Sequence, residues 1–157
     1  MEKYELLPAQ LKHEGTATKE DFFLPRKLTE KEILAVHKKS YWEKLKNLDF
    51  TRQEERKSGF PISAKLIERE ITINAGTIQC AEYAIKYGVS LNIAGGTHHA
   101  YSDRAEGFCL LNDIAIAARY LLDANLASKV LVIDLDVHQG NGTAEIFREN
   151  DSVFTFS

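Results

Sequence analysis

The residues best suited to chemistry lie in one short run, residues 132–142. Asp134, Asp136 and His138 occupy alternate positions where an apolar segment ends. A strand sends alternate side chains to one face, so these three groups converge if the extended geometry persists to His138. Neighbouring buried carboxylates need a cation or donors, and Zn²⁺ accepts carboxylate and imidazole ligands. The alternative is a strand end at which one Asp caps the next helix and His138 is an ordinary loop residue.

A second cluster follows another apolar segment. Residues 89–94 predict a strand that runs into a glycine turn, and His98 and His99 come shortly after it. Imidazole titrates near neutral pH, so a histidine pair suits general acid–base chemistry, although a tandem His in a polar loop is more often simply exposed. Both clusters lie at the C-terminal ends of predicted strands, the edge at which open α/β sheets bind ligands. Together they favour an active site.

Three motifs now stand in one order along the chain: GGTHHA at 95–100, GFCLLND at 107–113 and DLDVHQGNGT at 134–143. This set resembles the core motifs of the zinc-dependent histone deacetylases. A single His precedes Gln139 where many members have two, which is most similar to the class IV branch and its bacterial relatives. The resemblance is dense over residues 93–157 and weaker over 28–91.

The resemblance implies a catalytic role for four of these residues. Asp136 and His138 would be two of the three protein ligands of one catalytic Zn²⁺. The third family ligand is an Asp far downstream, to which no residue here can be matched. His98 and His99 would serve as general base and general acid, while the metal polarises the acyl carbonyl and activates water.

The resemblance also implies supporting residues around the histidines. Asp134 would hydrogen-bond His98 and, with Ser157, contribute to a structural K⁺ site. Asn141 stands where some members carry the Asp that partners His99. An amide cannot stabilise a protonated imidazole as a carboxylate does, which favours storage of the proton on His98.

The GFC motif would line the substrate tunnel. By resemblance, Phe108 forms one apolar wall and the carbonyl of Gly107 accepts a hydrogen bond from the substrate amide. Cys109 is interpreted as a residue that lines the pocket, because an unactivated thiol is only slightly ionised at neutral pH. Without the flanking motifs, Phe108 would be assigned to the core.

Composition limits the class of protein. The chain has 157 residues, 44% of them hydrophobic and 27% charged, with a formal net charge of −3. No apolar run approaches the ~18 residues needed to cross a bilayer, and no basic stripe suggests direct nucleic-acid binding. Two cysteines fit a reducing cytosol. We expect no membrane association and a cytoplasmic location, or a nuclear one in a eukaryote; the oligomeric state is not set by these features.

The order of predicted elements indicates an α/β fold. Expected helices cover residues 5–14, 29–36, 40–48, 63–69, 72–87, 112–123 and 143–148, and expected strands cover 89–94, 129–134 and 152–156. Alternation of this kind predicts a parallel sheet flanked by helices, and the resemblance implies the three-layer arginase/deacetylase fold. Residues 54–61 are interpreted as a solvated loop. Tyr41, Trp42, Leu45 and Leu48 are assigned to the core, as is Cys80, and His37 to structural support.

The final strand is apolar but has no helix or crossover after it to cover it. We therefore expect residues 1–157 to be the N-terminal portion of a single deacetylase catalytic domain that is truncated after Ser157. A truncation before Met1 is a second expectation that stays open.

The function that follows is hydrolysis of acyl (acetyl) groups from lysine side chains of histones or other proteins. Two alternatives stay open: deacetylation of small acylated amines such as polyamines, and a non-catalytic module that binds acyl-lysine or a partner. The isolated 157-residue segment is expected to be inactive, because it lacks the third metal ligand.

Overall fold

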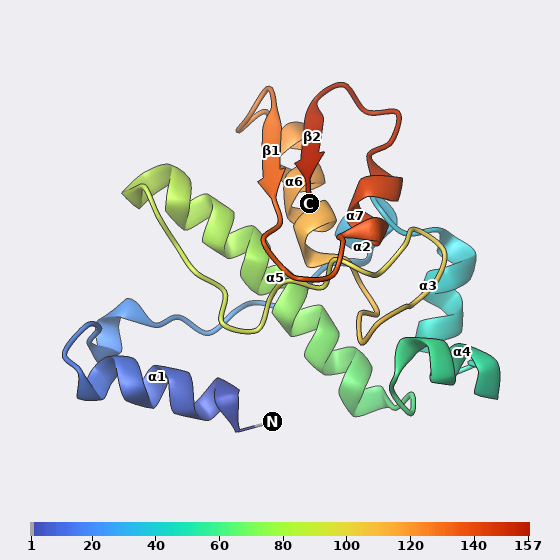
Figure 1. The fold of residues 1–157 in the computed structure, drawn as a ribbon, viewed down its shortest axis with the longest axis horizontal. Coiled ribbons are helices and arrows are strands. Elements are labelled where there is room, and N and C mark those ends of the chain that lie inside the picture. Colours follow the sequence, from blue (N-terminus) through green and yellow to red (C-terminus); the bar gives the residue numbers. More distant parts are fainter. Residues whose placement is uncertain (1) are drawn as a thin grey trace.

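The computed structural model describes residues 2–157 (Figure 1). In chain order its elements are α1 (Lys3–His13), η1 (Lys19–Asp21), α2 (Glu30–Leu34), α3 (Lys39–Lys46), α4 (Arg52–Ser58), α5 (Ala64–Tyr87), α6 (Asp113–Asp123), β1 (Val130–Ile133), α7 (Asn141–Ile146) and β2 (Val153–Phe156). The predicted α/β character is confirmed, since the two strands form a parallel sheet and helices pack against it. Each described helix is too short or too polar to cross a membrane.

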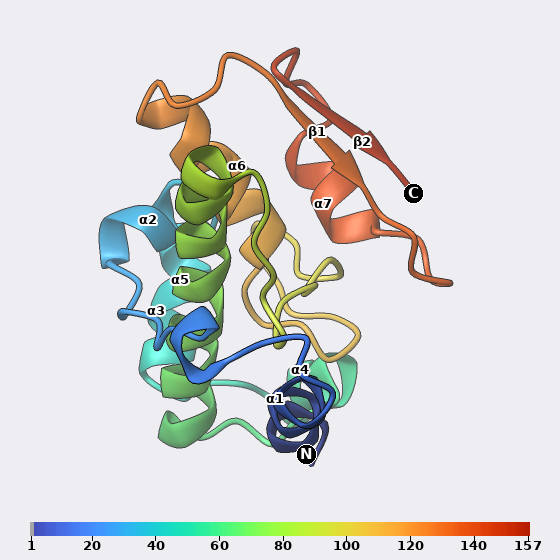
Figure 2. The ribbon, with the colours of Figure 1, turned by 90° about the vertical axis from the view of Figure 1, so that its left-hand side faces the viewer.

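Helix α5 is the central element, and α6 packs along it (Figures 1 and 2). The sequence predicted two helices here, but the structure has one helix of 24 residues. Neither Gly nor Pro interrupts the chain at residues 70–71, and the buried positions Ile67, Glu70, Asn74 and Ile78 continue one face across that point. The burial of this face joins the two predicted helices into one.

Helix α4 corrects the expected loop at residues 54–61. Thr51 caps it: its side chain accepts a hydrogen bond from the Glu54 amide at 3.3 Å, and the Glu54 carboxylate accepts one from the Thr51 amide at 2.8 Å. Gly59, at φ +76°, ends the helix in the left-handed conformation. The reciprocal cap stabilises a helix in a segment whose charged composition had suggested a loop.

Residues 89–94 were predicted to be a strand, and this is wrong for the described structure. Within residues 2–157, β1 pairs with β2 alone, so this segment has no neighbouring strand. Asn92 turns the chain instead. Its amide nitrogen donates to the carbonyl of Ile73 at 2.9 Å and to the hydroxyl of Thr77 at 2.7 Å, which fastens the segment to α5.

The two-stranded sheet pairs Val130 with Val153 and continues in parallel register to Ile133 and Phe156. One face packs against α6 and α7 through Val132 and Val153. The opposite face is apolar and about 60% exposed at Leu131, Ile133, Phe154 and Phe156. The continuous apolar sequence had predicted burial on both faces, whereas in the described residues only one face is covered.

A separate core among α2, α3, α5 and α6 contains the predicted aromatic cluster. Tyr41, Trp42 and Leu45 are buried, and so is Cys80, as expected. Leu48 is not part of this core. It follows the end of α3 at φ +57° and is 43% exposed, because the chain turns there and directs its side chain to solvent.

Candidate active site

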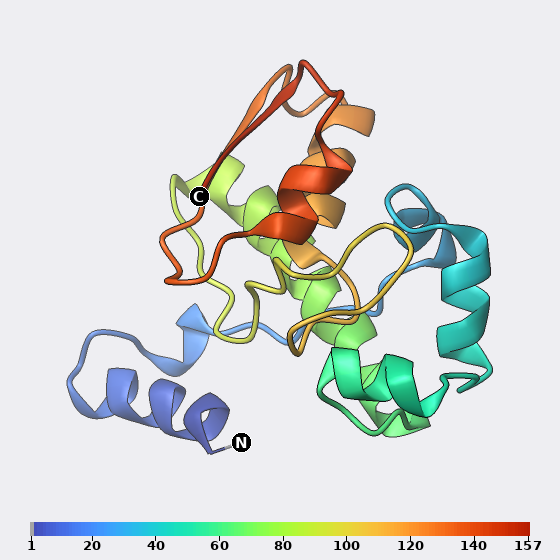
Figure 3. The ribbon, with the colours of Figure 1, turned by 45° about the vertical axis from the view of Figure 1, so that its right-hand side comes forward.

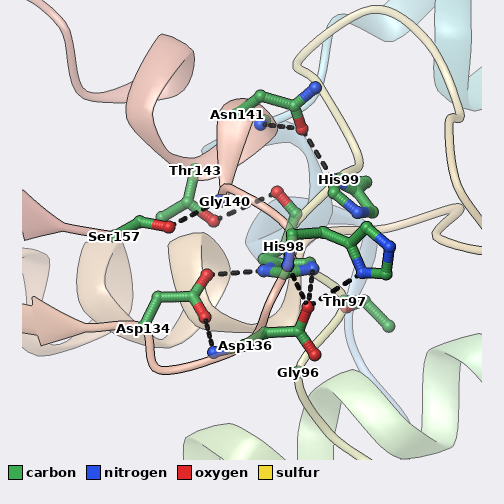
Figure 4. Close-up of polar contacts among 12 residues, drawn as sticks. Gly96, Thr97, His98, His99, Asp134, Asp136, Gly140, Asn141, Thr143 and Ser157 are labelled. Carbon is green, nitrogen blue, oxygen red and sulfur yellow. Dashed lines mark hydrogen bonds and ion pairs between the residues drawn. The ribbon is translucent and has the colours of Figure 1, made fainter.

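The polar residues singled out in the sequence meet where three chain segments come together. The loop between α5 and α6 passes between α7 on one side and α4 on the other (Figures 1 and 3). It carries the histidine pair, which faces Asp134 and Asp136 of the β1–α7 loop and Asn141 at the start of α7 (Figure 4). The expected extended geometry does not persist to His138: β1 ends at Ile133 and residues 136–138 form a bend, so these carboxylates lie in the loop after the strand.

His98 lies against the carboxylate of Asp134. Its side chain is 9% exposed, and Nδ1 donates to Asp134 Oδ2 at 2.5 Å. The other oxygen of Asp134 accepts the amide of Asp136 at 3.0 Å, so this carboxylate faces two donors. The proton on Nδ1 leaves Nε2 as the free nitrogen of the neutral ring.

His99 has an amide partner in place of a carboxylate. Its Nδ1 lies 2.7 Å from Asn141 Oδ1, and the same oxygen accepts the backbone amide of Gly142 at 2.9 Å. An atom that accepts from a backbone N–H must be the amide oxygen, so Nδ1 of His99 carries the proton. The two histidine rings lie 4.1 Å apart at 43°. Both therefore present Nε2 for proton transfer.

A buried carboxylate, Asp113, fixes the loop that carries the histidines. Its Oδ1 accepts both the amide and the hydroxyl of Thr97 at 2.7 Å, and its Oδ2 accepts the amide of Gly96 at 3.0 Å. The hydroxyl of Thr77 in α5 donates to Oδ2 at 2.6 Å. Asp113 was assigned no role from the sequence; the available signal was an acidic residue in the first turn of a mostly apolar helix.

Asn112 and His37 fix the other end of this loop. Asn112 caps α6 through Ala115, and its amide nitrogen donates to the carbonyl of Ala100 at 2.9 Å and to Thr143 Oγ1 at 3.1 Å. The Asn112 backbone amide donates to His37 Nε2 at 3.1 Å. Burial lowers the pKa of His37 to about 4, so the ring stays neutral and can accept this bond. The geometry agrees with a structural role for His37.

Asp136 and His138 lie side by side at the open end of the site. Asp136 Oδ1 accepts the amide of His138 at 2.8 Å and lies 3.1 Å from its Nδ1. This backbone hydrogen bond is the main reason that the pKa of Asp136 lies below its ordinary value. The two side chains are 52% and 74% exposed, and His98 Nε2 lies 3.9 Å from Asp136 Oδ1.

Asp136 and His138 match two of the three protein ligands of a catalytic zinc site. One carboxylate oxygen and one imidazole nitrogen are ligands that Zn²⁺ accepts, and they lie close enough together to share one ion. Within residues 2–157, no three His, Cys, Asp or Glu side chains come together as a complete ligand set. The residues present therefore fit the metal but supply only two of its ligands.

Ser157 is brought next to Asp134 through Gly140. Its hydroxyl accepts the amide of Gly140 at 2.8 Å. A Cβ on Gly140 would lie 2.4 Å from Asp134 Oδ2, so only glycine allows this close approach. Gly140 therefore contacts both residues assigned by resemblance to a K⁺ site, and the ion itself stays a prediction.

The GFC segment packs against the second histidine. A Cβ on Gly107 would lie 2.6 Å from Cδ2 of His99, which leaves room for glycine alone. Phe108 follows, 65% exposed, with its ring edge-on to that of Phe60 at 5.4 Å. Burial raises the pKa of Cys109 to about 11, which excludes a thiolate nucleophile at neutral pH.

Helix α4 sets the position of this segment. Gly107 donates its amide to the carbonyl of Lys57 at 3.1 Å, and Phe108 donates to that of Ser58 at 2.9 Å. Phe108 also covers Gly59, where a Cβ would lie 2.5 Å from its ring. Because this part of the chain was expected to be a solvated loop, its contact with the site could not be predicted from the sequence.

Comparison with known proteins decides the family, because the histone deacetylase domain matches residues 1–157. The chain belongs to the histone deacetylase family. An uncharacterized protein of Picosynechococcus is 40% identical over 157 residues, which is all of this chain and 52% of that protein. The acetoin utilization protein AcuC of Staphylococcus aureus is 35% identical over 88% of this chain and 38% of its own length.

The solved structures agree with this assignment. An HDAC homolog from Aquifex aeolicus has a TM-score of 0.76 and 30% sequence identity over 88% of this chain and 40% of its own. An HDAC homolog complexed with SAHA gives the same values. The predicted deacetylase-like α/β fold is thereby confirmed. The chain spans about half the length, or less, of the relatives it matches.

Proposed function

We propose that this chain forms the N-terminal part of the catalytic domain of a zinc-dependent amidohydrolase that removes acyl groups from lysine side chains. Membership of the histone deacetylase family supports this proposal. The observation that carries it is the histidine pair, in which Asp134 and Asn141 each hold the Nδ1 proton of one ring. Two rings fixed in this way are suited to proton transfer at Nε2.

Asp136 and His138 would hold the zinc ion, together with a third ligand from a part of the same protein outside residues 1–157. When bound, the ion would polarise the acyl carbonyl and lower the pKa of water beside it. The chain's own residues manage the protons. His98 takes up the proton of the attacking water at Nε2, and Asp134 stabilises the imidazolium that results. His99 acts in its doubly protonated form, in which Nδ1–H stays on Asn141 and Nε2–H passes to the departing amine, and His98 then returns the proton that it took from water to the solvent.

Three residues of the GFC segment would hold the substrate. We assign Phe108 to one wall of the tunnel, the Gly107 carbonyl to the substrate amide and Cys109 to the lining. The SAHA complex of a similar HDAC homolog supports a ligand of acyl-lysine type. We further propose a K⁺ ion at Asp134 and Ser157 and a cytoplasmic location. Small acylated amines are the alternative substrate class.

The test is zinc content and hydrolysis of acetyl-lysine peptides by the protein that contains this chain. We expect His98→Ala to abolish turnover with zinc still bound, and His138→Ala to lose the zinc. Val137→Ala is the matched control, because its side chain is 90% exposed on the same loop. Turnover by the zinc-free protein, or full activity of His98→Ala, would refute the mechanism. Hydrolysis by the isolated 157-residue chain would contradict its expected inactivity.

A further inference from the structure

We propose that Glu106 is a positioning residue for His99 and acts through the side-chain amide of Asn141. The proposal deepens the proposed function, since it rests on His99 as the residue that exchanges a proton with the substrate. Glu106 lies in the turn before Gly107, outside the residues that the sequence analysis assigned to the site.

The amide of Asn141 has partners on both of its ends. Its oxygen accepts from His99 Nδ1 at 2.7 Å and from the Gly142 amide at 2.9 Å. Its nitrogen, Nδ2, donates to Glu106 Oε1 at 3.4 Å. A continuous series of hydrogen bonds therefore runs from the carboxylate of Glu106 to the ring of His99.

This series has only one favourable orientation. Rotation of the Asn141 amide by half a turn would place its NH₂ group against two other donors, Gly142 N–H and His99 Nδ1–H. The same rotation would place the amide oxygen against the Glu106 carboxylate, so that two acceptors face each other. Glu106 thus disfavours the one rearrangement that would release the Nδ1 proton of His99.

Glu106 is itself held in place. Its amide donates to the Cys109 carbonyl at 3.2 Å, and the Cys109 amide donates back at 2.9 Å, which closes a tight turn. On the solvent side, Arg104 Nε lies 3.7 Å from Glu106 Oε2. The Arg104 guanidinium stacks on the ring of Tyr101, 3.4 Å from its centroid. The carboxylate is therefore oriented toward Asn141 by a folded turn and a stacked cation.

Glu106 matters because Asn141 stands where some family members carry an Asp. Asn141 orients His99 but brings no charge, whereas Asp134 brings charge directly to His98. The carboxylate of Glu106 lies on the far side of the Asn141 amide from the ring. It orients Asn141, the hydrogen-bond partner of His99, without forming an ion pair with the ring. The two histidines thus differ in how their orientation is maintained.

The test uses two variants of similar size. Glu106→Gln keeps an oxygen that can accept from Asn141, and Glu106→Met keeps the stem and removes the acceptor. The first readout is the ¹⁵N chemical shifts of the His99 ring nitrogens in the metal-free 157-residue chain, at a pH where the ring is neutral. We expect a protonated Nδ1 in wild type and Glu106→Gln, and a mixture of tautomers in Glu106→Met.

The second readout is kinetics of the protein that contains this chain, on an acetyl-lysine peptide. Loss of one hydrogen bond in the series should lower kcat about fivefold in Glu106→Met with KM unchanged, while Glu106→Gln restores kcat. Glu149→Gln is the control, because it neutralises an exposed carboxylate after α7, away from Glu106 and Arg104, and should change neither readout.

The outcomes separate this proposal from the proposed function. A wild-type tautomer and a wild-type kcat in Glu106→Met would overturn the role of Glu106 while leaving hydrolysis intact. An equal loss of kcat in Glu106→Gln and Glu106→Met would also overturn it, because the acceptor would then be irrelevant. If wild type hydrolyses no acyl-lysine, the proposed function fails, and the tautomer measurement still decides the role of Glu106.

Discussion

Glu70 shows how burial of a single carboxylate should control the stability of this protein. Its side chain lies in α5 and is 1% exposed. Oε1 lies 2.6 Å from Arg69 Nη1, whereas Oε2 has no hydrogen-bond partner among residues 2–157. Burial raises the pKa of Glu70 from 4.5 to about 7, although Arg69 acts in the opposite direction.

The sign of the effect follows from proton binding. Between pH 4.5 and about 7, the folded protein holds a proton on Glu70 that the unfolded chain has released. The free energy of unfolding therefore falls as the pH rises through this window, and the full penalty is present above pH 7. At about 1.36 kcal/mol per pKa unit, the difference between the two pKa values corresponds to about 3 kcal/mol.

Substitution of Glu70 by Gln removes the ionisation and keeps the size of the side chain. We expect Glu70→Gln to be more stable than wild type by about 3 kcal/mol above pH 7 and equal to it below pH 4.5. Urea denaturation followed by circular dichroism at several pH values between 4 and 8 measures the difference. A variant that is less stable than wild type at pH 8, or a difference that does not change with pH, would refute the argument.

Glu68→Gln is the matched control on the same helix. Glu68 is exposed and pairs with Lys27 at 2.6 Å, which lowers the pKa of Glu68 below its ordinary value. Its contribution to stability is therefore present above pH 4.5 and is lost only as the pH falls below that value. The difference in free energy of unfolding between Glu68→Gln and wild type should therefore stay constant between pH 5 and 8. Glu68→Gln should be the less stable of the two, whereas Glu70→Gln should be more stable than wild type.

Three further predictions test packing, capping and reactivity. Gly142→Ala places a Cβ 2.4 Å from the Ala100 carbonyl oxygen and should lower stability by about 1–3 kcal/mol in thermal denaturation; an unchanged Tm would contradict this contact. Thr51→Ala should lower stability by about 1 kcal/mol through loss of the α4 cap, and a wild-type urea midpoint would argue against that helix. In a Cys80→Ser background, Cys109 should react slowly with iodoacetamide at pH 8 until urea unfolds the chain, whereas rapid labelling of the folded protein would contradict its burial and high pKa.

Local sequence signals predicted most of the helices. The reciprocal cap of Thr29 and Glu32 marked the start of α2, where the Glu32 carboxylate accepts the Thr29 amide at 2.7 Å. The same pattern is present at Thr51 and Glu54, but only the run of charges from Glu54 was considered, and it was interpreted as a loop. Caps could be predicted because their partners are only three residues apart.

The strand prediction at residues 89–94 failed for the opposite reason. Apolar, β-branched composition favours a strand only where a neighbouring strand supplies hydrogen bonds, and composition does not reveal the neighbour. In the structure, Asn92 directs this segment onto α5 instead. The same limit applies to β1, whose sequence suggested burial on two faces although one is exposed in the described residues.

The sequence by itself determined the chemistry of the candidate site. Residue type and spacing marked His98, His99, Asp136 and His138 as candidates, because proton transfer and metal binding depend on particular functional groups, and the resemblance to the family supplied their roles. The prediction that Asp134 and Asn141 partner the two histidines agrees with the geometry, at 2.5 and 2.7 Å.

Only the tertiary structure decided how these groups are oriented. Asp113 fixes the histidine loop from α6, 16 residues away from Thr97, and Glu106 meets Asn141 across 35 residues of chain. Hydrogen bonds over such separations depend on where folding brings the chain, and no local periodicity carries that information. The sequence specifies which groups can react, and the packing of α5, α6 and α7 specifies which nitrogen of each histidine is free to do so.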